Sequence, residues 1–226
     1  VSGIVDEAAL FSNKLALKVS YTTNVGSSKL RVQDEVINSG SVPAEFELLY
    51  HINIGFPFIT PGAQIMVPFE KMTPREASAK ANLEKWDVCL PETPGSPENC
   101  YLFEVAADAE GQTRVLLINA QKDRGLSLSF SKREFPHFLI WKLMRPNGDT
   151  YVTGIEPCVN FPNTRSFEKK HGRVVTLEPG ASRAFHFDID VLLTQDELDV
   201  AKEEIEALQA KAARTIVADP IEEWCE

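Results

Sequence analysis

Runs with the two-residue period of β-strands follow one another along most of the chain. Segments rich in Gly, Pro, Asn and Asp separate them roughly every 8–15 residues, as in all-β sandwiches and barrels. We read eleven runs, at residues 14–23, 29–39, 44–55, 63–70, 100–107, 113–121, 126–132, 137–146, 151–157, 172–179 and 182–193. The sequence therefore predicts a mostly antiparallel β fold in which the strands form a large two-sheet sandwich.

One helix is expected after the last strand, at residues 194–214. Thr194 and Glu197 have the spacing of a capping box. The apolar stripe of this helix consists of Leu198, Ala201, Ile205, Leu208 and Ala212. We interpret it as a helix packed on the flank of the sandwich, and the alternative is a self-association seam of a homodimer. The expected division is a sandwich domain at residues 1–193 and a helix with a tail at residues 194–226.

Composition narrows the classes of partner. The net charge is −10 and the pI is near 5.0, which argues against nucleic acid or an anionic membrane as a partner. No apolar run is long enough to cross a bilayer. The four cysteines (Cys89, Cys100, Cys158 and Cys225) lack C-x-x-C or zinc spacing. Free thiols in a reducing compartment, and thus a cytoplasmic protein, fit best; a Cys89–Cys100 bridge in an oxidising setting is the alternative.

Residues 71–99 interrupt the strand pattern with a polar, proline-rich excursion. Long loops in compact domains tend to be functional or mobile. Arg75, Asp87 and Glu98 lie in this segment, where a solvated charge is the default interpretation. Trp86 also lies there, and its leading interpretation is core packing.

His51 lies in a strand run with one apolar face and one largely polar face. Asn53 shares the polar face, and Gly55 and Pro57 break the strand just beyond it. A histidine on a strand is more often structural than catalytic. The broken strand end, however, favours a place at the mouth of a cleft.

Glu156 lies between Ile155 and Pro157, two residues after Gly154. A carboxylate in such apolar surroundings is costly to bury, and the glycine lets another group approach closely. A surface glutamate at a strand end is the alternative. Asn160 follows in an irregular segment, where an amide is suited to bind hydroxyl groups.

Other chemistries find less support. Trp141 is best explained by core packing, although a tryptophan at a cleft wall stacks on the apolar face of a sugar. His186, Asp188 and Asp190 alternate on one strand, and a solvated edge explains them better than a metal site. The sequence has no G-x-S-x-G elbow, phosphate-binding glycine loop or H-E-x-x-H motif.

Three segments resemble the aldose 1-epimerase-like, or galactose mutarotase-like, proteins: "LLYHINIGFPF", "WKLMRPNGDTYVTGIEPCVNFPN" and "VVTLEPGASRAFHFDIDV". More narrowly, the chain is similar to the branch catalogued as a domain of unknown function. The resemblance implies a galactose-mutarotase-like antiparallel supersandwich that binds a sugar. In such enzymes further site residues come from strands that would precede residue 1, so we expect the fold to be incomplete at its N-terminus.

The resemblance also implies roles for individual residues. His51 corresponds to the general acid and Glu156 to the general base of anomer interconversion, a reaction that requires no metal and no cofactor. Asn53, Trp141 and Asn160 become sugar-contacting candidates. Asp87 and Arg75 are further candidates for substrate binding.

Three functions stay open at this point. The first is an isomerase that interconverts the anomers of a free aldose or a sugar derivative. The second is a noncatalytic carbohydrate-binding protein on the same fold, because a fold does not fix an activity. The third is a glycosidase that pairs Glu156 with Asp87, which requires two facing carboxyl groups about 5–10 Å apart.

Overall fold

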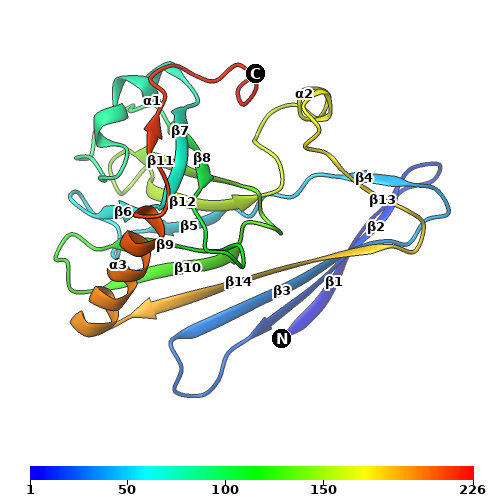
Figure 1. Cartoon of the computed structure of the whole chain (residues 1–226), viewed down its shortest axis with the longest axis horizontal. Coiled ribbons are helices and arrows are strands. Elements are labelled where there is room, and N and C mark those ends of the chain that lie inside the picture. The colour runs from blue at the N-terminus through cyan, green and yellow to red at the C-terminus, as the bar shows by residue number, and fades with distance from the viewer.

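The computed structural model describes all residues from 1 to 226 and is built mainly from β-strands (Figure 1). Seven strands form the larger sheet, in the order β1 (Ser2–Ala8), β2 (Lys14–Thr22), β3 (Lys29–Asn38), β14 (Ser182–Leu192), β10 (Gly125–Ser131), β9 (Gln112–Ile118) and β6 (Gln64–Met66). Six form the second sheet, in the order β15 (Thr215–Ile216), β7 (Phe69–Pro74), β8 (Asn99–Val105), β11 (His137–Met144), β12 (Tyr151–Cys158) and β5 (Ile52–Gly55). A third sheet pairs β13 (Val175–Leu177) with β4 (Ala44–Phe46).

The predicted fold class is confirmed: every one of the eleven runs contains a strand, and all pairings except that of β15 with β7 are antiparallel. Two runs differ in detail. The run at 44–55 divides into β4 and β5, and the run at 63–70 divides into β6 and the start of β7. The first division occurs because β4 pairs with β13 while β5 pairs with β12, so the chain changes sheets between them.

The main hydrophobic core lies between the two large sheets. The rings of Phe130 on β10 and Phe138 on β11 stack with centroids 5.7 Å apart, so the sheets pack face to face. Trp86, from the excursion at 71–99, packs edge-on against Phe69 in the same core. Burial of these large aromatic side chains, with the aliphatic residues of the same cluster, favours the packing of the two sheets.

The excursion contains the end of β7, the helix α1 (Ala77–Ala81) and the single turn η1 (Leu83–Lys85). Its second half is fixed by the buried side chain of Lys142, whose ammonium group donates to the carbonyl oxygens of Lys85, Trp86 and Val88 at 2.8–3.0 Å. Three backbone acceptors satisfy the buried charge and hold this loop against the sheet.

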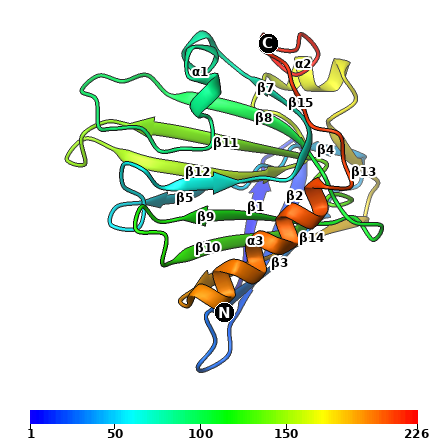
Figure 2. The same cartoon turned by 60° about the vertical axis from the view of Figure 1, so that its left-hand side comes forward.

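Helix α3 (Gln195–Gln209) covers part of the seven-stranded sheet, as Figure 2 shows. It begins with the predicted capping box of Thr194 and Glu197, and it ends five residues before the expected residue 214. Its buried residues pack on β9 and β14 in a cluster made of Leu116, Ile118, Leu192, Leu198, Ala201 and Ile205. Beyond α3 the chain crosses to the other sheet, where β15 lies beside β7.

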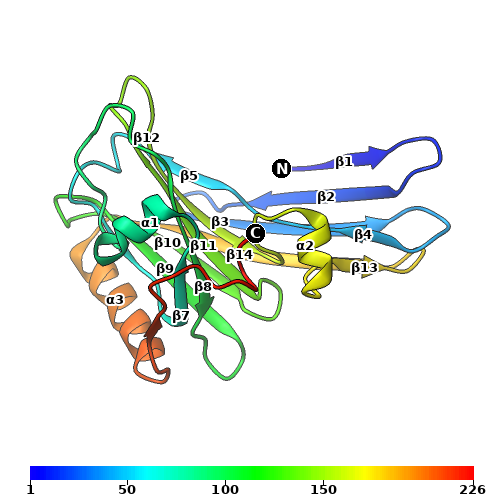
Figure 3. The ribbon, with the colours of Figure 1, turned by 90° about the horizontal axis from the view of Figure 1, so that it is seen from above.

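Strands β1 to β3 extend away from the body of the molecule together with β4 and β13 (Figure 3). All seven residues of β1 are exposed. Another short helix, α2 (Arg165–Lys170), follows β12. No helix of the chain is long and apolar enough to cross a membrane.

Candidate functional site

Strands β5, β12, β11 and β8 bring His51, Asn53, Glu156, Trp141 and Cys100 to one face of the six-stranded sheet, the face turned away from the main core. We call it the site face. In the register, Asn53 lies opposite Gly154, which in turn lies opposite Trp141. Ile52 lies opposite Ile155, so the next residue back along the strand, His51, adjoins Glu156.

His51 and Glu156 are in contact. The imidazole Nε2 of His51 lies 3.1 Å from Oε1 of Glu156. The histidine side chain is 45% exposed, whereas the glutamate side chain is only 3% exposed. The contact lacks hydrogen-bond alignment, so this buried oxygen has no hydrogen-bond partner. A buried acceptor without a partner is costly for stability, which is typical of a functional group.

Burial also changes the acidity of Glu156. Removal of the carboxyl group from water raises its pKa to about 8, because the charged form loses its hydration. The group is therefore able to bind and release a proton near neutral pH. Perturbed carboxyl groups of this kind are candidates for general acid–base chemistry.

Gly154 makes room for the glutamate. A Cβ atom placed at residue 154 would overlap Oε1 of Glu156. Asn53 and Trp141 lie on either side of this glycine in the sheet. The sequence suggested that another group approaches this glycine closely. That group is the carboxyl group of Glu156, two residues further along the same strand.

Trp141, on β11, packs against His51 across β12. Their ring centroids are 5.4 Å apart and their planes meet at 65°, an edge-to-face contact. The indole N–H donates a 2.8 Å hydrogen bond to Oε2 of Glu98. Sequence reasoning treated Glu98 as a solvated charge, because nothing in the pattern of a loop indicates that its side chain reaches a strand residue.

The two asparagines differ in their surroundings. Asn53 is exposed on the site face. Asn160 is buried, and its side-chain oxygen accepts from the backbone N–H of Leu48 while its amide group donates to the carbonyl of Phe161. The structure therefore uses Asn160 to join two backbone segments, and it leaves Asn53 free for a ligand.

The two charged candidates lie apart from His51. Arg75 is on the site face beside Cys100, four strands away from Asn53, and its guanidinium donates to the carbonyl of Pro162. Asp87 lies in the loop that Lys142 holds, and Lys142 points to the opposite face of the sheet from its neighbour Trp141. Asp87 is therefore not brought to Glu156, and the geometry gives no support to a glycosidase pair.

The C-terminal tail forms one border of the site face. Trp224 packs on Phe161 with centroids 5.1 Å apart, in the same cluster as Trp141 and Cys100. Asn163 donates to the carbonyl of Trp224 and accepts from the backbone N–H of Glu226. The sequence analysis grouped the tail with the helix at residues 194–226 and did not place it here, because no periodicity marks this contact.

Other polar clusters lie elsewhere. His186 contacts Glu134 at 3.2 Å on the seven-stranded sheet, and Asp188 pairs with Arg31. No three His, Cys, Asp or Glu side chains are arranged to hold a metal ion. All four cysteines have free thiols.

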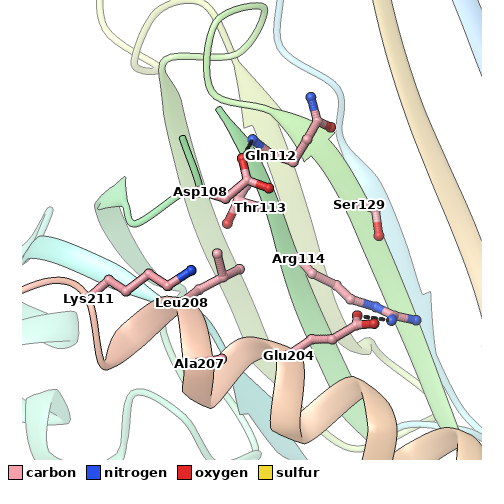
Figure 4. A pocket seen from close by; sticks show the side chains of 9 residues that line it. All are labelled: Asp108, Gln112, Thr113, Arg114, Ser129, Glu204, Ala207, Leu208 and Lys211. Carbon is pink, nitrogen blue, oxygen red and sulfur yellow. Dashed lines mark hydrogen bonds and ion pairs between the residues drawn. The ribbon is translucent and has the colours of Figure 1, made fainter. Parts of the chain in front are cut away.

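A hollow of about 320 Å³ lies between the C-terminal half of α3 and the N-terminal part of β9, beside β10 (Figure 4). Arg114 lies beside it, with hydrogen bonds from its guanidinium to Ser127 and Glu204. None of the residues that line this hollow belongs to the site face. It is therefore separate from His51 and Glu156.

Comparison with known proteins identifies the family and the fold. The chain matches, over residues 1–191, a family described as Domain of unknown function (DUF4432). No curated protein matches it significantly. A putative aldose 1-epimerase from Klebsiella pneumoniae superposes with a TM-score of 0.94 at 27% sequence identity, covering 97% of this chain and 57% of that chain.

More distant structures share the fold. A galactose mutarotase-like protein from Clostridium acetobutylicum has a TM-score of 0.56 at 20% identity, covering 84% of this chain and 62% of that one. A putative aldose 1-epimerase from Escherichia coli has a TM-score of 0.54 at 16% identity, covering 84% and 64%. The chain thus spans 57–64% of the length of these three proteins.

The packed antiparallel sheets and these neighbours define a protein of the galactose mutarotase-like fold, as the resemblance implied. The chain belongs to the family described as Domain of unknown function (DUF4432).

Proposed function

We propose that this chain carries the acid–base pair of an aldose 1-epimerase-like isomerase, which interconverts the anomers of a free aldose or a sugar derivative. The observation that carries the proposal is the contact of His51 Nε2 with the buried Oε1 of Glu156 at 3.1 Å. A proton donor and a proton acceptor side by side, with the donor exposed, suit a reaction that consists of two proton transfers.

Interconversion proceeds by ring opening. Glu156, as the carboxylate, takes the proton of the anomeric hydroxyl, and His51, as the imidazolium, gives a proton to the ring oxygen. The bond between the anomeric carbon and the ring oxygen breaks, its electron pair stays on the ring oxygen, and an aldehyde forms. Rotation of the aldehyde and reversal of both transfers close the ring on the other face.

The pair needs one proton to start this cycle. At neutral pH the raised pKa of Glu156 favours its protonated form. Transfer of that proton to His51 yields the carboxylate and imidazolium that the first step uses. A sugar hydroxyl that reaches Oε1 must displace the imidazole from its present contact, because this oxygen is shielded from solvent. The His51 side chain is 45% exposed, so this displacement moves the imidazole toward solvent and not into the packed interior.

Exchange NMR on the purified protein with a panel of aldoses tests the proposal. We expect faster α/β interconversion than in buffer, and we expect His51→Ala and Glu156→Gln each to lower the rate about 10²–10⁴-fold without loss of the fold. The matched controls are His186→Ala and Glu134→Gln, which remove a His–Glu contact of 3.2 Å on the other sheet. They should leave the rate unchanged.

Saturation transfer to bound sugar in the same samples separates the alternative. Binding without faster exchange would indicate a noncatalytic carbohydrate-binding protein, in which Trp141 and Asn53 serve as contacts. Full exchange in both soluble site variants would overturn the assigned roles. The free thiols suit a reducing compartment, and we propose a cytoplasmic location.

A further inference from the structure

We infer that Glu98 is a positioning residue of the His51–Glu156 pair, acting through the indole of Trp141. This inference rests on the proposed function. Three contacts form a continuous chain: Glu98 Oε2 accepts from the indole N–H of Trp141 at 2.8 Å, the indole meets the imidazole of His51 edge-to-face at 5.4 Å, and the imidazole adjoins Glu156 at 3.1 Å.

Trp141 and His51 meet across an intervening strand. Trp141 is on β11 and His51 precedes β5, so β12 runs between them. Neighbouring strands lie about 4.8 Å apart, which places the two backbones roughly 10 Å apart. Gly154 lies between Asn53 and Trp141 in the register and has no side chain of its own, and the carboxyl group of Glu156 fills the space where a Cβ atom would lie. The edge-to-face contact of the two rings therefore spans β12, and a restraint on the indole also acts on the imidazole.

The hydrogen bond of Glu98 supplies this restraint. Glu98 is exposed, but its backbone is held, because Ser78 donates to its carbonyl oxygen at 2.7 Å. The flanking residue Asn99 is buried and donates to the carbonyl of Pro97. The loop thus presents the carboxylate from a fixed place, and the bond from the indole N–H to a charged acceptor is of the stronger kind.

The residues of the site face therefore have two kinds of role, proton transfer and positioning. Glu156 and His51 exchange protons with the ligand, whereas Trp141 limits the positions of the imidazole and Glu98 limits the positions of the indole. Mispositioning of an acid–base group by about 1 Å is sufficient to lower a rate by 10²-fold. Loss of the Glu98 bond should therefore act on the catalytic step more than on stability.

The test uses Glu98→Ala, Glu98→Gln and Trp141→Phe in the whole chain. The first readout is the NMR shift of the His51 ring protons, assigned with His51→Ala, because a ring 5.4 Å away shifts them. We expect Glu98→Ala to move these resonances and Glu98→Gln, which keeps an oxygen acceptor, to leave them near the wild-type positions. Glu92→Ala, in the same loop and on a residue without a hydrogen bond, is the control.

The second readout is the rate. We expect kcat about tenfold lower in Glu98→Ala, with KM and the melting temperature nearly unchanged, and recovery in Glu98→Gln. In the Trp141→Phe background, Glu98→Ala should have no further effect. Unmoved His51 resonances in Glu98→Ala would overturn the inference even if the protein has no isomerase activity. Moved resonances in an inactive wild type would support the positioning contact and refute only the proposed function.

Discussion

Glu156 is deeply buried and its pKa is raised, so the free energy of unfolding should depend on pH even without a substrate. Its pKa rises from 4.5 to about 8 on folding. Between these values the folded chain binds more protons than the unfolded chain, so the free energy of unfolding decreases as the pH rises through this window. One pKa unit corresponds to about 1.4 kcal/mol.

We therefore predict that Glu156→Gln removes this pH-dependent loss. Near pH 4.5 the variant and the wild type should have similar unfolding free energies. At pH 9 the variant should be more stable by a few kcal/mol, since glutamine has no charge to desolvate. Urea unfolding at a series of pH values measures the difference. A constant difference from pH 4.5 to 9 would contradict the assignment, and Glu92→Gln in the exposed loop provides the baseline.

Gly154 gives a second prediction for a single residue. Gly154→Ala should displace the Glu156 carboxyl group, because the new Cβ overlaps Oε1, and it should cost about 1–3 kcal/mol of stability. Thermal or urea unfolding measures this cost. Gly148→Ala is the matched control, since a Cβ there meets no atom within 4 Å. If the overlap is the cause, the cost of the alanine should largely disappear in a Glu156→Ala background.

At the same scale, sequence reasoning found part of the site. His51 and Glu156 stood out because ionisable groups on strands with a glycine or proline nearby are unusual, and the structure brings the two together. Asn160 matched the residue type of a hydroxyl binder, yet backbone groups take its hydrogen bonds. Glu98 could not be found in advance, because its partner is 43 residues away and the loop has no period.

Among the elements, α3 was the easiest to predict and is directly testable. Both hydrogen bonds of its capping box form, from the Glu197 backbone to the Thr194 side chain and from the Thr194 backbone to the Glu197 side chain. Thr194→Ala should cost about 1 kcal/mol in urea unfolding. Thr164→Ala should cost less, because Thr164 precedes α2 without capping it. Equal costs would argue against a contribution of the capping box to stability.

The apolar stripe of α3 shows what periodicity leaves open. It predicted a buried face but not the surface that covers it. The structure packs Leu198, Ala201 and Ile205 on β9 and β14 of the same chain, so these residues are not available to a second copy. The run at 44–55 shows a similar gap: its alternation gave the correct faces, but pairing partners far along the chain divide it into β4 and β5.

On the scale of the whole molecule, the segment after α3 joins parts that the sequence separates. The side chain of Gln209, at the end of α3, exchanges two hydrogen bonds with the backbone of Phe69 on β7. Thr73, on the same strand, donates to the carbonyl of Asp219. With the contacts of Trp224 at the site face, the tail connects the helix on one sheet to the outer side of the other. This argues for one cooperative unit rather than units at 1–193 and 194–226.

We accordingly predict that the tail opens together with the six-stranded sheet. Hydrogen exchange read by mass spectrometry at increasing urea should show residues 215–226 and strands β11 and β12 losing protection at the same denaturant concentration, as expected for a single transition. Strand β1 is the internal control, since all its residues are exposed and it should open earlier. Early, separate opening of the tail would instead support the two-part division. The tail borders the site face, so its early opening should also alter the surroundings of Trp141. If the tail opens only together with the six-stranded sheet, its contacts at the site face should persist for as long as that sheet is folded.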